Sequence, residues 1–497
     1  MIWYPITPNT TKLEIENSLE GITEEQYDYV ILRGTLAYAD KLFSGDNPEV
    51  QLIEYAKKHL KEDGKLLLAV DNKIGIRNYS EIQQKPKDGK KLTRKQIEEL
   101  LETTGLKYYK FYYPLPDCEI TNVIFTDKFL PNQETIVRNI SLHEKEDVVI
   151  QLENKLFLDL LEQDKNLFKL FANSYLIECS RQEFPDNQIE FVSFSNMRKP
   201  EYSIKTIIQG DKVYKTAMNE QAKSHIEDIK KNLDVLNQLG FRTLDSYEED
   251  VIISQYQKEK ETLDNIIIHQ IKSGKKEEAI QLITRFFQEI KEKLNMQTVS
   301  KNILDEYEIP YETNQIENLT FTKYGLWDLI FQNAFYMDDQ FFFYDQEWIE
   351  EGVPIEYIFY RSMEYTRGLK EMLAVEEIYQ KFGISEQQLN LFLQLDNKLQ
   401  EKTRNQQVWD KHVQMQTING LKAEIEQGKE ENQKLLEDCK KLLNEKDARI
   451  CFLEENMDKT VKLLQQKESQ ITQMENSTSW KITEPLRKLK RGEKNEN

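Results

Sequence analysis

The sequence predicts a multidomain α/β protein that ends in an α-helical coiled coil. Strand and helix signals alternate over the first quarter of the chain, which is typical of a doubly wound sheet. Four strand-like runs and then helices follow, which indicates a bilobal domain, and the last fifth repeats apolar residues three and four apart. We expect four parts, with boundaries at 1–133, 134–395, 396–475 and 476–497, because 497 residues exceed one core.

Composition and charge exclude several classes of protein. The formal net charge is −20, so general binding to nucleic acid is not expected, because phosphate contacts need clustered Lys and Arg. The first residues lack a signal-peptide pattern, and no apolar run nears the roughly 18 residues of a membrane span. The four Cys and five His are scattered, which predicts a cytoplasmic protein with free thiols and no Cys/His metal site.

The first part, 1–133, reads as a partial Rossmann-like sheet. Residues 27–36 and 65–72 are apolar runs of buried-strand type, and Asn47-Pro48 opens an amphipathic helix between them. Thr93 and Gln96 form a capping-box pattern before a second helix. Residues 107–114 and 120–127 close the unit as strands, which we expect to be antiparallel.

The segments YDYVILRGTLAYAD, DGKLLLAVDNKIGIRNY, YYKFYYPLPD and NVIFTDKFLP resemble the back half of a class I SAM-dependent methyltransferase. That family binds SAM at a Gly-rich turn after its first strand, whereas the glycines before residue 60 here are isolated. The segment before Tyr27 is too short for two further strand–helix units. We therefore expect a truncated, SAM-binding-deficient half-domain, with Asp71 and Asn72 where the family's pocket would lie.

The second part, 134–395, has the element order of the protein-kinase and aminoglycoside-kinase fold. NSYLIECS, IEFVSFSN, YSIKTIIQ and KVYKTAMN read as strands of a small β-rich lobe, and Gly210-Asp211 is a hairpin turn between the last two. A helix over 220–239, a strand over 251–259 and an amphipathic helix over 275–294 follow. The order predicts a β lobe, a linker and a helical lobe.

The run LWDLIFQNAFYMDDQFFFYDQEW holds polar residues at the spacing of a kinase active site. Such enzymes place an Asp near the acceptor hydroxyl, an Asn five residues later on a metal, and a second Asp on the metals further along. Asp328 and Asn333 have the first spacing, and Asp345 ends an apolar strand. We expect Asp328 to be catalytic, and Asn333 and Asp345 to bind Mg²⁺ on ATP.

The upstream strands offer the expected nucleotide-binding residues. Lys215, on the strand after the hairpin, matches the Lys that holds nucleotide phosphates, with Glu227 or Glu220 in the next helix to orient it. No Gly-rich loop is present, but Arg198 and Lys199 lie between two of the strands as phosphate contacts. Leu326 replaces the usual His before the catalytic Asp, and DQEW replaces DFG.

WDLIFQN, FFYDQEW and VPIEYIFYRSMEY resemble the kinase-like domain that follows the methyltransferase half in bacterial surface-polysaccharide proteins. The domain order resembles O-antigen chain-terminating kinase–methyltransferases, which implies a phosphotransferase acting on a surface polysaccharide or lipid-linked sugar. One alternative is a non-catalytic, membrane-associated scaffold that organises glycosyltransferases. A weaker one is a sugar O-methyltransferase.

The C-terminal part carries the apolar rhythm of a coiled coil and then a basic tail. The a/d-type positions, with one single-residue shift after Leu442, are Ile418, Leu421, Ile425, Gly428, Asn432, Leu435, Cys439, Leu442, Ile450, Leu453, Met457, Leu464, Ile471 and Met474. This pattern predicts a homo-oligomer, as a dimer or trimer.

The tail, STSWKITEPLRKLKR, combines an aromatic residue with five basic ones, which suits peripheral contact with an anionic membrane at its inner face. It resembles the short tail found near glycosyltransferases of bacterial envelope assembly.

The coiled coil should set the assembly state of the protein. A chain ending at residue 400 should have a monomer mass in multi-angle light scattering, whereas the full chain should have two or three times its monomer mass. Equal mass multiples for the two chains would contradict the coiled-coil prediction.

Overall fold

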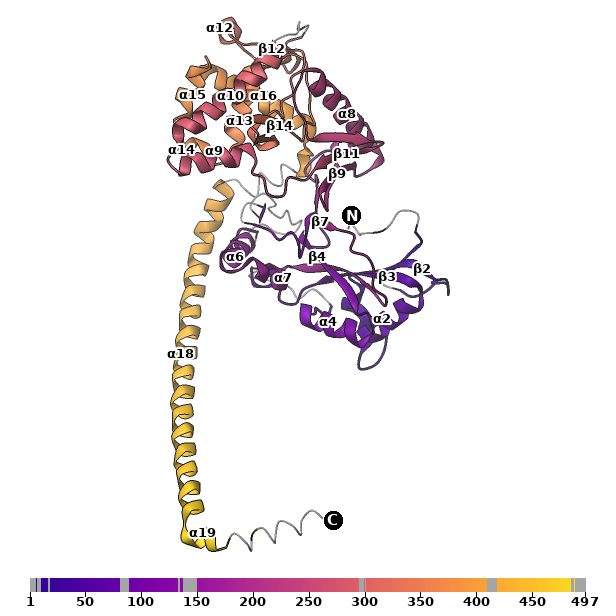
Figure 1. The fold of residues 1–497 in the computed structure, drawn as a ribbon, viewed down its shortest axis with the longest axis vertical. Coiled ribbons are helices and arrows are strands. Elements are labelled where there is room, and N and C mark those ends of the chain that lie inside the picture. The colour runs from indigo at the N-terminus through magenta and orange to yellow at the C-terminus, as the bar shows by residue number, and fades with distance from the viewer. Residues whose placement is uncertain are drawn as a thin grey trace. The chain divides into compact units, whose positions relative to one another are not determined.

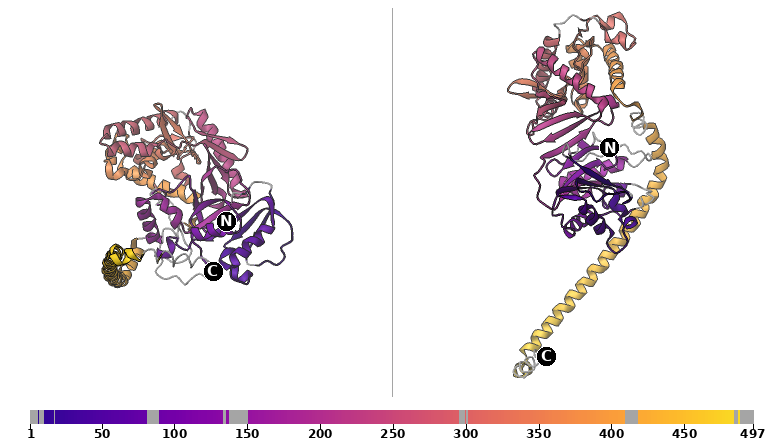
Figure 2. Two further views of the ribbon diagram at one scale, coloured as in Figure 1. Left: turned by 60° about the horizontal axis from the view of Figure 1, so that its bottom comes forward. Right: turned by 90° about the vertical axis from the view of Figure 1, so that its right-hand side faces the viewer.

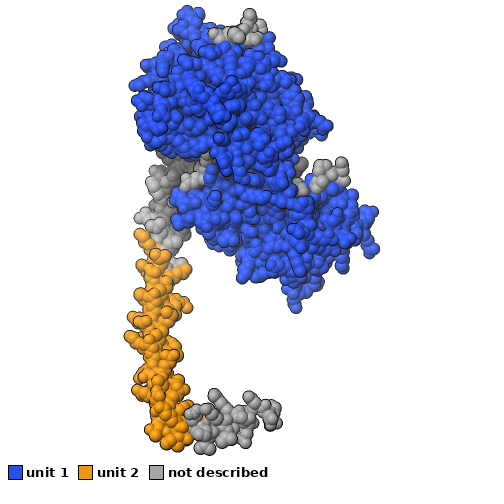
Figure 3. All heavy atoms as spheres, viewed as in Figure 1, with its two compact units in different colours: residues 1–413 blue, residues 414–497 orange. Residues whose placement is uncertain are grey.

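A computed structural model of the chain describes residues 6, 10–16, 18–80, 89–132, 135–136, 150–294, 299, 301–408, 418–483 and 487. The chain divides into two compact units, residues 1–413 and residues 414–497, which Figure 3 colours separately. Unit 1 is mixed α/β with a large mixed sheet, and unit 2 is helical.

The N-terminal part of the sheet begins with three parallel strands, β1 (Lys12–Ile15), β2 (Tyr27–Arg33) and β3 (Leu60–Asp71). Alternate residues of β2 face opposite sides, and both sides are buried. On one side Val30 and Leu32 join a core with α2 (Pro48–Lys58) and α4 (Arg94–Thr103). The Asn47-Pro48 helix start and the Thr93–Gln96 capping box are confirmed.

The strand β6 (Ser174–Ser180) differs from its predicted place. NSYLIECS was expected in the small lobe of the second part, yet β6 pairs with β3 on one side and with β4 (Tyr108–Pro116) on the other, antiparallel to both. All seven residues of β6 are buried. A strand of this kind is stable in the centre of a sheet that is covered on both faces, but not at an exposed edge. The N-terminal layer therefore draws on residues beyond the expected boundary at 133.

Among the described residues of unit 1, one sheet of 11 strands has the order β1-β2-β3-β6-β4-β5-β7-β8-β9-β11-β10. Figure 2 shows its indigo and magenta strands from two further directions. The expected antiparallel pair of β4 and β5 (Thr121–Thr126) is confirmed. β5 in turn pairs with β7 (Ile189–Phe194), which makes the two parts of the chain continuous through hydrogen-bonded backbone. The far end of the sheet comprises β8 (Ile204–Gln209), β9 (Lys212–Ala217), β10 (Asp245–Glu248) and β11 (Val251–Gln255).

The hairpin between β8 and β9 confirms the turn predicted at Gly210-Asp211, and Gly210 has the positive φ of 61° that this turn requires. The helix α8 (Lys223–Gln238) follows and packs on these strands through Ile226, Ile229 and Leu233, which share a core with Ile204 and Ile252.

The helical part of unit 1 is built around a cluster of phenylalanines. The helices α9 (Leu263–Lys272), α10 (Lys276–Leu294), α13 (Ile355–Tyr365) and α16 (Glu386–Thr403) gather on one side of the molecule (Figure 1). Phe286 of α10 is fully buried, with its ring 4.9 Å from that of Phe331 and 5.3 Å from that of Phe341. This packing fixes the hairpin of β13 (Ala334–Met337) and β14 (Gln340–Phe343), which leads to Asp345.

The remaining described elements of unit 1 are short, apart from the 14-residue helix α6. They are η1 (Thr35–Tyr38), α1 (Ala39–Leu42), α3 (Arg77–Ser80), α6 (Ile150–Gln163), η2 (Lys165–Leu167), α7 (Phe168–Phe171), η3 (Pro200–Tyr202), η4 (Glu220–Ala222), α11 (Ile303–Glu306), α12 (Thr313–Ile316), β12 (Phe321–Thr322), η5 (Phe331–Asn333), β15 (Val353–Pro354), α14 (Leu369–Met372) and α15 (Val375–Lys381).

Unit 2 consists of α18 (Ile418–Asn476) and α19 (Thr478–Ile482). A helix of 59 residues is about 90 Å long, and an apolar row along it stays exposed at seven-residue spacing, at Leu443, Ile450, Met457, Leu464 and Ile471. The oligomer stays a prediction. Residues 484–486 and 488–497 of the basic tail lie outside the described residues. Within the part of the chain that the structure describes, no helix combines the length and apolar character needed to cross a membrane.

The Phe286 cluster should be a main source of stability for unit 1. Phe286→Ala should lower the free energy of unfolding by about 3–5 kcal/mol, because it removes a fully buried ring and leaves a cavity. Urea unfolding followed by tryptophan fluorescence measures the change. Leu393→Ala on α16, where the side chain is 49% exposed, should change it by less than about 1 kcal/mol, and equal losses for the two variants would contradict this assignment of the core.

Candidate functional site

A cavity of about 550 Å³ lies between the strands β7, β8, β9 and β11 and the segment that follows β14. Apolar side chains form much of its wall, while charged side chains converge at one end. The apolar wall includes Phe191, Phe194, Ile204, Ile208, Val213 and Leu244, and the charged end includes Arg198, Lys215, Asp345 and Glu347. An apolar cavity with a few convergent polar groups is the usual form of a small-molecule site.

Lys215 occupies the centre of this charged end. It lies on β9 between Thr206 of β8 and Ile252 of β11, so its backbone is fixed by strands on both sides. The side chain is buried, and its ammonium group contacts the Asp345 carboxylate and lies 3.3 Å from Oε1 of Glu347. Such ion pairs offset part of the cost of burying the Lys215 side chain.

Glu347 gathers the basic groups of the site. Its carboxylate contacts the Arg198 guanidinium and Lys215, and Oε2 lies 3.4 Å from Nε2 of His225 on α8. Asn232, also on α8, donates a hydrogen bond to the Glu347 carbonyl at 2.8 Å. Burial alone would raise the pKa of Glu347, but the positive charges of Arg198 and Lys215 outweigh it and hold this pKa well below its usual range.

Asp345 sits at a sharp turn after β14. Its φ of 60° lies in the left-handed region, which Asp tolerates better than most residues. Its backbone N–H donates to Oδ2 of Asp245 at 2.8 Å, and Asp245 also accepts a hydrogen bond from the Ser254 hydroxyl. Burial raises the pKa of Asp245. The strands β10 and β11, at the far end of the sheet, therefore set the position of Asp345.

Asn333 joins the two halves of the predicted motif. Its Nδ2 donates to the carbonyl of Asp328 at 3.2 Å and to the carbonyl of Asp345 at 3.4 Å. The backbone N–H of Tyr344 donates to the Asn333 carbonyl at 3.0 Å. The spacing that the sequence analysis singled out thus corresponds to three residues held together in space.

Asp328 faces a second cavity, of about 330 Å³, which shares Arg198, Asp345 and Glu347 with the first. Its Oδ1 lies 3.6 Å from the Arg361 guanidinium, which also binds the Asp396 carboxylate at 2.6 Å. Burial raises the pKa of Asp328 to about 6, although the Arg361 charge acts in the opposite direction. A carboxylate with this pKa can accept a proton near neutral pH.

The structure brings together five of the six site residues that the sequence predicted, namely Lys215, Arg198, Asp328, Asn333 and Asp345. Glu227 does not join them. It lies on the exposed side of α8 and pairs with Lys230 at 2.5 Å. Glu220, the other expected partner of Lys215, is exposed and pairs with Lys223 at 2.8 Å. Lys199 donates instead to the carbonyl of Lys402.

Sequence reasoning missed Glu347, His225, Asp245 and Arg361. Glu347 follows Asp345 by two residues, so the motif itself held the signal. His225 and Asn232 fall on the apolar face of α8 with Ile226 and Ile229, where polar residues stand out. Nothing in the sequence marks Asp245, since its role depends on a contact 100 residues away.

Among the described residues, no group of three or more His, Cys, Asp or Glu side chains could hold a metal ion by itself. At nucleotide sites Mg²⁺ is bound by one or two carboxylates, and nucleotide phosphates complete its octahedron. Asp345 and the amide oxygen of Asn333 supply hard oxygen ligands of that kind, so the donor set fits a metal carried in by a nucleotide.

No family model matches the chain, and no curated protein matches it either. Solved structures that resemble part of it include two small-molecule kinases. A choline kinase from Streptococcus pneumoniae aligns with 13% identity over 43% of this chain and 82% of its own, with a TM-score of 0.26. An ethanolamine kinase from Plasmodium vivax aligns with 10% identity over 58% of this chain and 93% of its own, with a TM-score of 0.25. TM-scores this low assign neither a fold family nor a function to this chain.

The raised pKa of Asp328 should appear in the pH dependence of stability. Between the unfolded value near 4 and the folded value of about 6, the native state binds more protons, so the free energy of unfolding falls as pH rises. The loss should be about 2–3 kcal/mol and complete above the folded pKa. Asp328→Asn should remove this loss when urea unfolding is measured from pH 4 to 7.5.

The matched control is Asp338→Asn, the same change at an exposed turn residue, which should leave the slope as in the wild type. A wild-type slope retained in Asp328→Asn would show that the Asp328 carboxyl titrates normally.

Proposed function

We propose that the protein is a kinase-like phosphotransferase that uses Mg-ATP. The observation that supports this most is the pair of adjoining cavities, one with Lys215 and one with Asp328, which share Arg198, Asp345 and Glu347. Phosphoryl transfer needs a donor and an acceptor on either side of a metal-binding carboxylate, with a basic group on the phosphates.

Each residue has a role that its contacts support. Lys215, fixed on β9 and oriented by Glu347, would hold phosphate oxygens. Asp345 and Asn333 would hold Mg²⁺, and Arg198 would neutralise phosphate charge at the border of the two cavities. When bound, Mg-ATP supplies the phosphoryl group and shields its charge.

Asp328 would take the proton of the acceptor hydroxyl. As that oxygen forms its bond to phosphorus, the bond to the leaving diphosphate breaks and the proton passes to the Asp328 carboxylate. The pKa of about 6 leaves this carboxylate largely ionised at neutral pH, which a general base requires. The Arg361 guanidinium, 3.6 Å from Oδ1 of Asp328, would orient this carboxylate.

For the acceptor we propose a hydroxyl of a surface polysaccharide or lipid-linked sugar, the class implied by the sequence resemblance. The N-terminal part would then be a methyltransferase remnant without SAM. In the same proposal the oligomer forms through α18, the basic tail contacts the inner face of the membrane, and glycosyltransferases are partners.

Mg-ATP should raise the melting temperature of the wild-type protein, by a stabilisation of about 2.7 kcal/mol at a hundredfold excess over Kd. Asp345→Asn and Lys215→Met should abolish that rise. Asp328→Asn should retain it but lower the rate of transfer to glycoside acceptors by about 10²–10⁴-fold, because it removes only the base. Differential scanning fluorimetry and a coupled ADP assay measure these effects.

Glu227→Gln is the matched control, because it changes a carboxylate on the exposed side of α8 and should behave as the wild type. If Mg-ATP, Mg-GTP and Mn-ATP all leave the wild-type melting temperature unmoved, the phosphotransferase proposal fails and the scaffold hypothesis takes its place.

A further inference from the structure

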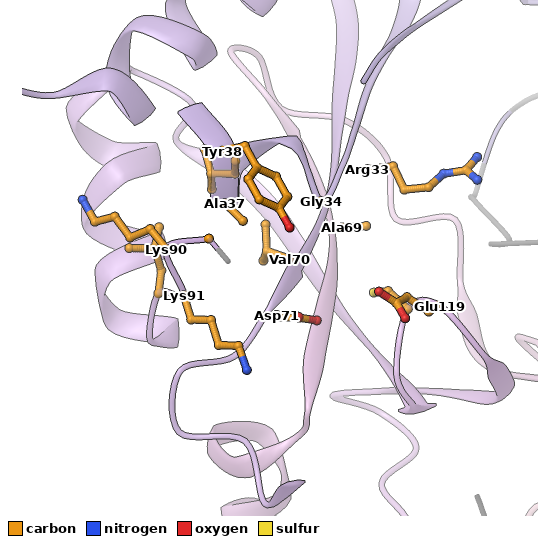
Figure 4. A pocket seen from close by; sticks show the side chains of 14 residues that line it. Arg33, Gly34, Ala37, Tyr38, Ala69, Val70, Asp71, Lys90, Lys91 and Glu119 are labelled. Carbon is orange, nitrogen blue, oxygen red and sulfur yellow. The ribbon is translucent and has the colours of Figure 1, made fainter. Parts of the chain in front are cut away.

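A separate cavity of about 380 Å³ lies in the N-terminal part of unit 1 (Figure 4). It opens at the carboxyl ends of the parallel strands β2 and β3, and its lining residues are all different from those of the two cavities above. In open α/β sheets, ligands bind in the crevice outside the carboxyl ends of the strands. The place in the fold is therefore one where a ligand is expected.

One side of this cavity is apolar and carries an aromatic ring. Leu36, Ala37, Val70 and Leu92 line it, with Tyr38 among them. Figure 4 shows the Tyr38 hydroxyl pointing inward toward β3. Lys41 Nζ lies 4.6 Å from the centroid of the Tyr38 ring, and this cation–π contact helps to hold the ring in its orientation.

The other side carries two carboxylates, from Asp71 at the end of β3 and from Glu119 before β5. Both residues line this one cavity, as Figure 4 shows.

The segment that carries Glu119 is held in place. The backbone N–H groups of Glu119 and Ile120 donate to Oδ1 of Asp117 at 2.7 and 2.8 Å, and Asp117 is paired with the Arg77 guanidinium. Asp71 is fixed by strand pairing, opposite Ser174 of β6. Two acceptors on rigid supports form a pre-organised arrangement, which lowers the entropic cost of binding.

The basic residues of the lining are already paired. Lys90 binds Glu49 at 2.6 Å, Arg33 binds Glu14 at 2.7 Å, and Lys91 donates to the side-chain oxygen of Asn78 at 2.8 Å. The cavity therefore offers an anion little uncompensated positive charge. Asp71 and Glu119 have partners too, but a carboxylate has about four lone-pair sites and can accept further hydrogen bonds.

We propose that this cavity binds a neutral sugar. The ring would lay its C–H face on Tyr38 and the apolar side, while adjacent hydroxyls donate to Asp71 and Glu119. The proposal does not depend on phosphotransfer at Lys215, so either one can fail without the other.

Ligand-observed saturation-transfer NMR on the full chain tests it, with methyl glycosides of glucose, galactose, mannose and N-acetylglucosamine as probes. At least one glycoside should bind saturably, and Glu119→Gln and Asp71→Asn should each raise its Kd about tenfold, the effect of losing one charged hydrogen bond. Glu119 is exposed, so its variant should fold, and circular dichroism checks this. Glu102→Gln, an exposed carboxylate on α4, should bind as the wild type.

Two results would overturn the proposal. One is the absence of saturable binding by every glycoside, and the other is a glycoside Kd that Glu119→Gln leaves unchanged. Saturable binding of SAM or of spermidine that displaces the glycoside and weakens in Glu119→Gln would assign the cavity to another ligand class, and would overturn it too.

Discussion

The arrangement of the candidate site depends on one buried carboxylate, that of Glu347. An unpaired buried charge costs several kcal/mol, so the segment after β14 is stable only where basic groups meet it. Those groups come from three places: Arg198 from the connection between β7 and β8, Lys215 from β9, and His225 from α8. The carboxylate thus fixes how the end of the sheet, α8 and the helical part of unit 1 come together.

Around Glu347, neighbouring carboxyl groups acquire opposite properties. Glu347 has two cationic partners and remains ionised, whereas burial raises the pKa of Asp328 to about 6, and its neighbour Arg361 also pairs with Asp396. Environments that separate the pKa values of nearby acids are how a site divides electrostatic support from proton transfer. Glu347 of DQEW and Asp328 of WDLIFQN therefore differ in pKa, although the sequence alone does not distinguish these two acids.

Local features were predictable from sequence because their causes are local. The turn at Gly210, the capping box at Thr93 and the amphipathic pattern of α10 each depend on residues a few positions apart. The choice of Glu347 over Glu227 as the partner of Lys215 was not predicted, because it depends on which carboxylate is buried next to β9. The periodicity of the helix gave some indication, because Glu227 lies outside the helix face that contains the buried residues 226 and 229.

The placement of β6 had no local signal at all. Its residues are apolar enough for the N-terminal part of the sheet or for the far end. Only the pairing with β3 and β4 distinguishes these two positions. Asp245 is a similar case, since its value to Asp345 arises from contact across 100 residues of chain.

The unbroken sheet also limits how the two walls of the candidate site can move relative to one another. β7 is hydrogen-bonded to β5 on one edge and to β8 on the other, and Asn196, just before Arg198, donates to the carbonyl of Thr121 at 2.8 Å. The strands that hold Lys215 are therefore anchored to the N-terminal layer and cannot rotate as an independent lobe. The helical part is tied to the same strands by the backbone bridges Thr243–Phe343 and Arg198–Arg404, so moving the two walls of the cavity apart would break both bridges.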